Sequence, residues 1–140
     1  MNVSFNFLSI IPLSSRNKLK SFIDDLIKEE GKKLDNLNFI FCSDEYLLDI
    51  NNTYLAHNYY TDIITFDLGE KGAKAISGDI FISTDRVIDN AQAFNSKLNI
   101  ELHRVIFHGV LHLCGYKDKT KVTRLKMTAK EDYYLSKYFN

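Results

Sequence analysis

The segment HGVLHLCGYKDKT, from His108 to Thr120, is the part around which the chain is organised. His108 and His112 stand four residues apart in an apolar run, so on a helix both imidazoles leave the same face. Gly115 suits the left-handed turn that ends a helix, and the chain can then fold back and bring Asp118 to the histidines. Two imidazoles, a carboxylate and an open fourth position match a catalytic zinc site. The segment therefore predicts one zinc ion per chain, held by His108, His112 and Asp118.

A His-x-x-x-His pair also occurs in helices that bind no metal, with one histidine exposed and the other in the core. The apolar neighbours of this pair favour metal binding, because low dielectric disfavours the charged imidazole and leaves a neutral ring able to ligate. Gly109 stands between the histidines and costs the helix about 1 kcal/mol relative to alanine. We expect the close approach of another backbone or of a substrate to offset this cost.

The length and composition of the chain indicate one domain spanning residues 1–140. This length is enough for a single core, the apolar share is 45%, and no repeat, linker or low-complexity tract interrupts the chain. No stretch reaches the roughly 18 to 20 apolar residues of a membrane helix, and the first residues lack the basic flank of a signal peptide. We therefore expect a cytoplasmic protein, and two cysteines fit a reducing compartment.

The formal net charge of zero is unevenly spread. Residues 101–140 carry 8 Lys and Arg against 4 Asp and Glu, whereas residues 1–100 carry 10 against 14. The basic side chains near the predicted metal site are Arg104, Lys117, Lys119, Lys121, Arg124 and Lys126. They form either a solvated lysine-rich loop or a patch that attracts an anionic substrate.

The hydrophobic pattern alternates between the period of a strand and that of a helix. Strands are expected at residues 3–7, 37–41, 63–66 and 75–82. The expected helix caps are Ser14 or Ser15, then Ser43, then Ser83 or Thr84, with the helices ending near residues 31, 54 and 94. The histidine helix and a last helix at 122–138 follow. This order predicts an α+β domain with a small mixed four-stranded sheet, whose last two strands are antiparallel and whose helices lie on one face.

Several motifs in this order resemble those of the YbeY-type endoribonucleases, a family of bacterial rRNA maturation factors. HGVLHLCGYKD is similar to the family signature H-G-x-L-H-L-x-G-Y-D-H. Three upstream segments match in the same order: YTDIITF at residues 60–66 resembles P-T-D-V-L-S-F, GDI at 78–80 matches a strand start, and EL at 101–102 matches a helix start. The resemblance is dense from about residue 44 to residue 118.

The resemblance implies a metalloprotease-like fold, a zinc ion and cleavage of single-stranded RNA. The family acts in processing the three-prime end of small-subunit ribosomal RNA and in ribosome quality control. The implied partners are single-stranded RNA, ribosomal RNA or the ribosome, with neither DNA nor a membrane. His108 and His112 take the first two ligand places and act in catalysis through a metal-held water. That water or the RNA's own two-prime hydroxyl would attack the phosphodiester.

Two positions depart from the family pattern. Asp118 stands where the family has a third histidine, and its negative charge predicts an activity optimum at higher pH than in a three-histidine relative. Leu55 stands where the family has an arginine, so another cation must contact phosphate. His57 aligns with a second basic family position, although it could be an ordinary loop histidine. Lys117 or Lys119 could supply charge from the other rim.

Three polar residues upstream have two possible roles each. Thr61 and Asp62 precede a strand, where they would bond local backbone groups or else line the substrate groove. Asp79 or Asp62 could accept the outer N–H of a ligating histidine. His103 lies off the ligand face and is expected at the surface or in packing.

Two other functions fit parts of the sequence. Zinc proteases share His-x-x-x-His, but they place a glutamate directly after the first histidine, where this chain has Gly109. Peptide hydrolysis therefore ranks below RNA cleavage. A metal-stabilised ribosome-assembly module that does not cut RNA would fit Leu55 and Asp118.

Overall fold

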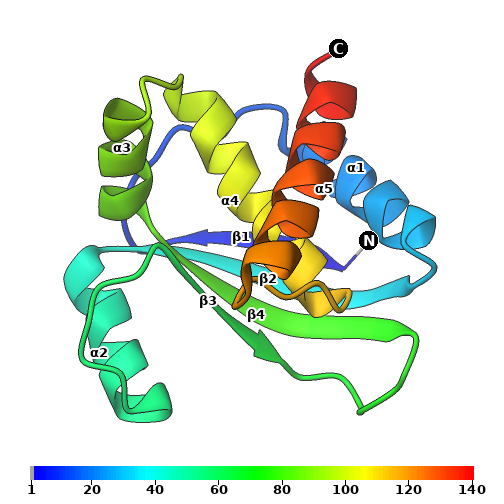
Figure 1. The fold of residues 1–140 in the computed structure, drawn as a ribbon, viewed down its shortest axis with the longest axis horizontal. Helices are drawn as coiled ribbons and strands as arrows, with labels where there is room; N and C mark the ends of the chain where they lie inside the picture. Colours follow the sequence, from blue (N-terminus) through cyan, green and yellow to red (C-terminus); the bar gives the residue numbers. More distant parts are fainter. Residues whose placement is uncertain (1) are drawn as a thin grey trace.

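The structure is a computed structural model that describes residues 2–140, and in that range it has four strands and five helices. Among these residues, no helix combines the length and the apolar character needed to cross a membrane. In chain order the elements are β1 (Val3–Phe7), α1 (Arg16–Glu29), β2 (Lys33–Cys42), α2 (Asp44–Leu55), β3 (Ile63–Asp67), β4 (Ala75–Ser83), α3 (Thr84–Ala93), α4 (Leu98–Leu113) and α5 (Lys121–Phe139) (Figure 1).

The four strands form one mixed sheet in the order β1-β2-β4-β3. β1, β2 and β4 are parallel to one another, and β3 is antiparallel to β4. The connection between β3 and β4 is a short loop with two glycines, which suits an antiparallel pair. The predicted α+β fold with a small mixed sheet is therefore confirmed. β3 lies at one edge of the sheet, and this position matters for the site.

The prediction that all helices lie on one face of the sheet is wrong. α1, α4 and α5 lie on one side and α2 lies on the other (Figure 1). The second face is not uniformly polar, because Ile64 of β3 is buried there beside Phe66 and Phe81. α2 covers this apolar patch with Leu47 and Ile50. The prediction fails because β3 carries apolar side chains on both faces of the sheet, Ile63 towards α4 and Ile64 towards α2, so each face needs a helix to cover it.

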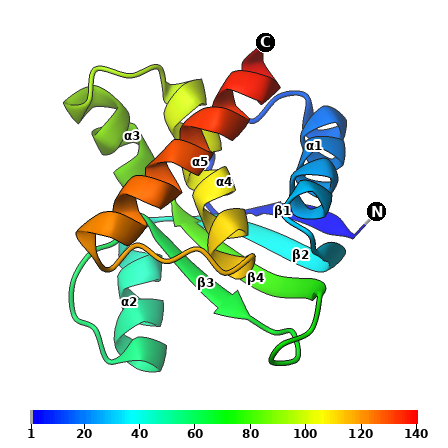
Figure 2. The same ribbon diagram turned by 45° about the vertical axis from the view of Figure 1, so that its right-hand side comes forward.

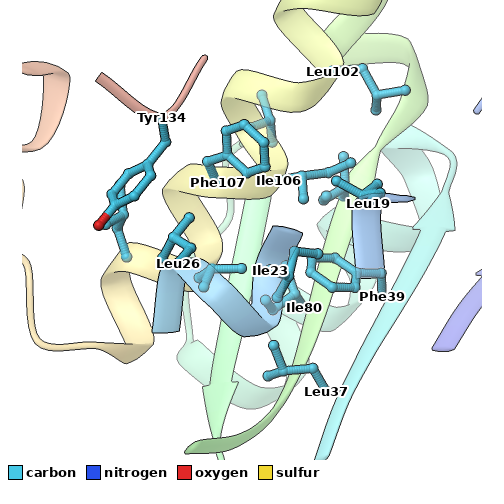
Figure 3. Close-up of a cluster of buried hydrophobic side chains, with 14 of the residues drawn as sticks. Leu19, Ile23, Leu26, Leu37, Phe39, Ile80, Leu102, Ile106, Phe107 and Tyr134 are labelled. Atoms are coloured by element: carbon cyan, nitrogen blue, oxygen red, sulfur yellow. The ribbon is translucent and has the colours of Figure 1, made fainter. Parts of the chain in front are cut away.

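α4 is the centre of the main core. Its Ile106 and Phe107 belong to the same buried cluster as side chains of α1, such as Ile23, and side chains of the strands, such as Ile80 (Figure 3). Gly109 lets α4 approach the sheet, since a Cβ there would lie 2.9 Å from Cδ1 of Ile63 and 3.0 Å from Cγ2 of Ile80. The close approach thus comes from sheet side chains rather than from a backbone or a substrate. It seats the histidine helix tightly against the edge of the sheet.

The helix caps follow the prediction with one exception. Ser43 and Ser83 are extended and accept hydrogen bonds from the N–H groups of Tyr46 (3.2 Å) and Arg86 (3.1 Å). Ser15 precedes α1 but has a φ of 55° and makes no side-chain cap bond. A cap side chain reaches the first turn from an extended backbone, which Ser15 lacks.

α4 ends in the turn that the sequence predicts at Gly115, whose φ is 112°. The N–H of Gly115 donates to the carbonyl of His112 (3.0 Å), and the N–H of Tyr116 donates to that of Leu111 (3.1 Å). The chain then turns back to Thr120, which caps α5 (Figure 2). This return brings Asp118 and Lys119 to the side of α4 that carries the histidines.

Candidate active site

A cleft of about 490 Å³ opens where the edge strand β3 faces α4 and α5. We call one side the helical wall, formed by Arg104, His108, His112, Asp118, Lys119 and Glu131. We call the other side the loop wall, formed by Leu55, His57, Tyr59, Thr61 and Asp62. The cleft therefore gathers most of the predicted site residues from segments that are far apart in the chain.

His108 and His112 lie on the same face of α4, with parallel rings whose centroids are 6.4 Å apart. The His108 side chain is largely buried, whereas His112 is exposed at the cleft. Nδ1 of His108 lies 2.7 Å from Oε2 of Glu131, a buried carboxylate on α5. Because a carboxylate only accepts hydrogen bonds, the proton of the neutral ring sits on Nδ1. Nε2 of His108 is thereby left free to face the cleft, as a ligand nitrogen must.

The carboxylates around His108 favour a positive charge, either on the His108 ring or on a bound cation. Burial alone would lower the pKa of His108, but the hydrogen bond and charge of Glu131 raise it, and so do Asp118 and Asp62. Burial raises the pKa of Asp62; His108 opposes this shift, and Glu131 and Asp118 add to it. Burial also raises the pKa of Glu101, which Arg104 opposes and Asp62 and Glu131 reinforce. The cleft thus holds several carboxylates whose mutual repulsion a bound cation would relieve.

Arg104 lies one helical turn before His108 and fixes the far side of Glu131. Its Nη1 donates to Oε1 of Glu131 (3.0 Å), and its Nη2 donates to Oδ1 of Asp132 (2.6 Å). Both carboxylate oxygens of Glu131 are therefore engaged, one by Arg104 and one by His108. This arrangement holds the imidazole of His108 in one orientation.

Asp118 comes to His108 as the sequence predicts. Its Oδ2 lies 3.3 Å from Nε2 of His108. Two ligands at about 2.0 to 2.2 Å from one tetrahedral ion are themselves about 3.3 to 3.5 Å apart, so this pair could share a metal. In residues 2–140, however, no three His, Cys, Asp or Glu side chains form a group that could hold an ion. The donor chemistry of the three residues and the His108–Asp118 spacing fit a metal.

The loop wall has contacts between close neighbours in the chain and ties to α2 and to the end of β4, where the N–H of Ser83 donates to the carbonyl of Asp62 (2.9 Å). Nδ1 of His57 lies 2.9 Å from the hydroxyl of Tyr59, and the two rings stack with centroids 5.1 Å apart. The hydroxyl of Thr61 donates to the carbonyl of Ile63 (3.3 Å), the local bond that its position favours. The amide of Asn51 donates to the carbonyl of Tyr59 (2.9 Å) and ties the loop to α2. His57 therefore faces the cleft as part of a stacked pair.

Asp79 and Lys117 lie outside the cleft lining. Ile80 faces α4, so Asp79, the preceding residue of β4, points to the opposite face of the sheet. There it accepts a hydrogen bond from the amide of Asn38 (3.0 Å). The expectation that Asp79 orients a histidine is wrong, because strand alternation turns it away and Glu131 takes that role. Lys117 is exposed and outside the lining, whereas Lys119 lines the cleft.

Sequence reasoning missed Glu131 and counted Arg104 only as nearby charge. Arg104 precedes His108 by four residues, and that helical spacing could have placed it beside the ligand. Glu131 is 23 residues from His108 on another helix, so no local pattern identified it. His103 was expected either at the surface or in packing, and the structure shows the second. Its side chain is buried, and its ring stacks on that of Tyr138 with centroids 5.0 Å apart.

Comparisons with known proteins agree with the resemblance seen in the motifs. The family model described as Endoribonuclease YbeY matches residues 9–139. Endoribonuclease YbeY of Cytophaga hutchinsonii is 54% identical over 124 residues, which are 89% of this chain and 86% of the relative. That of Christiangramia forsetii is 47% identical and covers 86% of this chain and 82% of its own.

A similar structure has also been solved. The solution structure of a Thermotoga maritima protein aligns with a TM-score of 0.66 at 26% sequence identity. The alignment covers 99% of this chain and 89% of that protein. The architecture described here is therefore one that an experimental structure also adopts.

Proposed function

Since the chain belongs to the YbeY family of endoribonucleases, it is an enzyme that cuts RNA, and we propose that it uses a zinc ion to cut single-stranded RNA. The proposed substrate is small-subunit ribosomal RNA, at its three-prime end, and the proposed setting is ribosome maturation and quality control in the cytoplasm. The observation that carries this proposal is the contact series Glu131–His108–Asp118 within one cleft.

His108, His112 and Asp118 are the residues that would hold the metal ion. A bound ion would lower the pKa of a water molecule and stabilise charge that develops on a phosphate oxygen. Glu131 keeps the ring proton of His108 on Nδ1, so Nε2 presents its lone pair to the cleft. Arg104 holds the other oxygen of Glu131 and prevents the carboxylate from turning away. The protein thereby orients one imidazole before any ligand binds.

The cations available to RNA phosphates lie at the rim of the cleft. Arg104 is engaged by two carboxylates, and Leu55, at the position of the family arginine, is 41% exposed. Lys119 on the helical wall and His57 on the loop wall remain as proposed phosphate contacts. The exposed ring of Tyr59, stacked on His57, offers a face for a nucleobase. We therefore propose that RNA binds mainly through Lys119, His57 and Tyr59.

Peptide hydrolysis has less support than RNA cleavage. The general base of His-x-x-x-His proteases follows the first histidine, and this chain has Gly109 there. Ile63 and Ile80 already occupy the space that a Cβ at Gly109 would need. A side chain at this position would require Ile63 and Ile80, or α4 itself, to move. The fold therefore disfavours the protease arrangement as well as lacking its base.

The test is to incubate the purified, zinc-loaded protein with single-stranded RNA and, separately, with casein. We expect RNA to be cut and casein to be left intact, and we expect His112→Ala to abolish RNA cleavage. Cleavage of casein would indicate the protease instead. Binding of RNA without cleavage would favour a ribosome-assembly module. An elemental assay of the natural protein and of Asp118→Ala tests the ligand set directly, and a metal-free natural protein would contradict it.

A further inference from the structure

A second carboxylate, remote from the cleft, gathers three donors. Glu30 follows the last residue of α1, and its side chain is only 9% exposed. It accepts hydrogen bonds from the hydroxyl of Tyr116 (2.7 Å), the hydroxyl of Tyr134 and the ammonium of Lys130 (3.1 Å). Tyr134 and Lys130 belong to α5, whereas Tyr116 belongs to the turn after α4. We call residues 117–119 the Asp118 loop. Glu30 therefore joins the end of α1 to both segments that flank this loop, the turn after α4 and helix α5.

The three donors keep Glu30 ionised. Burial alone would raise the pKa of Glu30, but the hydrogen bonds of Tyr134, Tyr116 and Lys130 hold it below its usual value. Hydrogen bonds to an ionised acceptor are roughly twice as strong as those between neutral groups. The Glu30–Tyr116 contact is thus a strong one.

Tyr116 stands two residues before Asp118, at the start of the loop that carries it. The backbone of Tyr116 closes the turn after α4 through Leu111, and its side chain is held by Glu30. At the other end of the loop, Thr120 caps α5 and the guanidinium of Arg124 donates to the carbonyl of Lys119 (3.1 Å). The loop thus has one anchor on each side of Asp118.

We propose that Glu30 is a positioning residue, which acts through Tyr116 to fix the loop that places Asp118 beside His108. This inference rests on the proposed function only in taking Asp118 for a metal ligand. Glu30 touches neither the metal ligands nor the cleft, and of its three donors only Tyr116 is directly connected to the loop that carries Asp118. A buried carboxylate that served stability alone would depend on all of its donors in the same way.

The chain offers a matched pair of variants for the test. Tyr116→Phe and Tyr134→Phe each remove one hydroxyl from Glu30 and keep the aromatic ring. Only Tyr116 is attached to the Asp118 loop, while Tyr134 lies within α5. Urea unfolding of both variants shows how far each lost bond weakens the fold. If the two variants lose similar stability, any difference between them in the mobility of the loop or in zinc affinity reports how far Tyr116 positions Asp118.

The first measurement needs no metal. Amide order parameters for residues 117–119 are measured by NMR relaxation, on a scale where about 0.85 is rigid and values below about 0.6 are flexible. We expect them to fall towards about 0.6 in Tyr116→Phe and to stay unchanged in Tyr134→Phe. Unchanged values in Tyr116→Phe, or the same fall in both variants, would overturn the inference.

The second measurement is zinc affinity by competition with a chelator. We expect Tyr116→Phe to bind zinc about tenfold more weakly, the effect of losing support around a ligand, and Tyr134→Phe to bind as the natural protein does. Equal affinity of the two variants would overturn the inference. If the natural protein binds no zinc, the metal in the proposed function fails, and the order parameters alone decide the role of Glu30. Glu30→Gln, which keeps the side-chain shape, should repeat the pattern of Tyr116→Phe in a weaker form.

Discussion

The two walls of the cleft are built in different ways. On the helical wall, the contacts that orient His108 come from Glu131, 23 residues away on another helix, and from the Asp118 loop. On the loop wall, His57 contacts Tyr59 and Thr61 contacts Ile63, each only two residues away. The contacts that fix the helical wall join separate elements, whereas those of the loop wall are partly local, with two ties to other elements: the amide of Asn51 to the carbonyl of Tyr59 and the N–H of Ser83 to the carbonyl of Asp62. This difference predicts that the helical wall sets the chemistry and that the loop wall adapts to the substrate.

The largest effect should come from the carboxylate that supports the helical wall. Glu131→Gln keeps the shape but cannot accept from both His108 and Arg104 as a carboxylate does. We expect zinc affinity to fall by roughly 10- to 100-fold, with a parallel loss of RNA cleavage. Chelator competition and single-turnover cleavage measure these two effects.

The matched control for this change is Asp132→Asn. Asp132 contacts Arg104 beside Glu131, but its side chain is 59% exposed and does not reach His108. Its exposed ion pair with Arg104 contributes about 1 kcal/mol or less to stability. The zinc affinity of Asp132→Asn should therefore stay within about twofold of that of the natural protein. Equal losses in the two variants would mean that charge near Arg104, rather than support of His108, sets metal affinity.

The next effect tests the loop wall, through the position where the family has arginine. Leu55→Arg adds a cation at an exposed point of the cleft rim. We expect KM for single-stranded RNA to fall about fivefold with little change in kcat, and the log–log salt dependence of binding to steepen by about 0.7. Leu55→Gln, long but uncharged, serves as the control. A change in kcat alone would place this residue in the chemistry instead.

A smaller effect should follow from changing the charge of the metal site. Asp118→His replaces an anionic ligand with a neutral one, so a bound ion keeps more of its charge and acidifies water more strongly. We expect the pH optimum of RNA cleavage to move to lower pH, by roughly half a unit to one unit. Superimposable pH profiles for the two proteins would contradict a ligand role for Asp118.

The smallest effect compares two lysines that flank Asp118. Lys119 lines the cleft and Lys117 does not, although both are exposed. We expect Lys119→Ala to weaken RNA binding about two- to threefold at low salt, since an exposed charge pair contributes about 0.2 to 1 kcal/mol. Lys117→Ala should leave binding unchanged. Filter binding at two salt concentrations distinguishes them, and equal losses would indicate a diffuse basic patch.

Much of the fold could be predicted because its signals are local. Alternation marked the strands, the glycine loop marked the antiparallel pair, and Gly115 marked the end of the histidine helix. The face that a helix covers is less local, since it depends on which side of the sheet still exposes apolar groups. The placement of α2 over Ile64 could therefore not be read from the alternation of β3.

The sequence by itself determined the chemical inventory of the site: two histidines on one helix face, a returning aspartate, and leucine in place of an arginine. Only the tertiary structure decided which carboxylate supports His108, because the contact joins α4 to α5 and strand alternation removes Asp79 from reach. Spacing along one helix or strand fixes directions within that element. Distances between elements follow from how their faces pack, and no single segment contains that information.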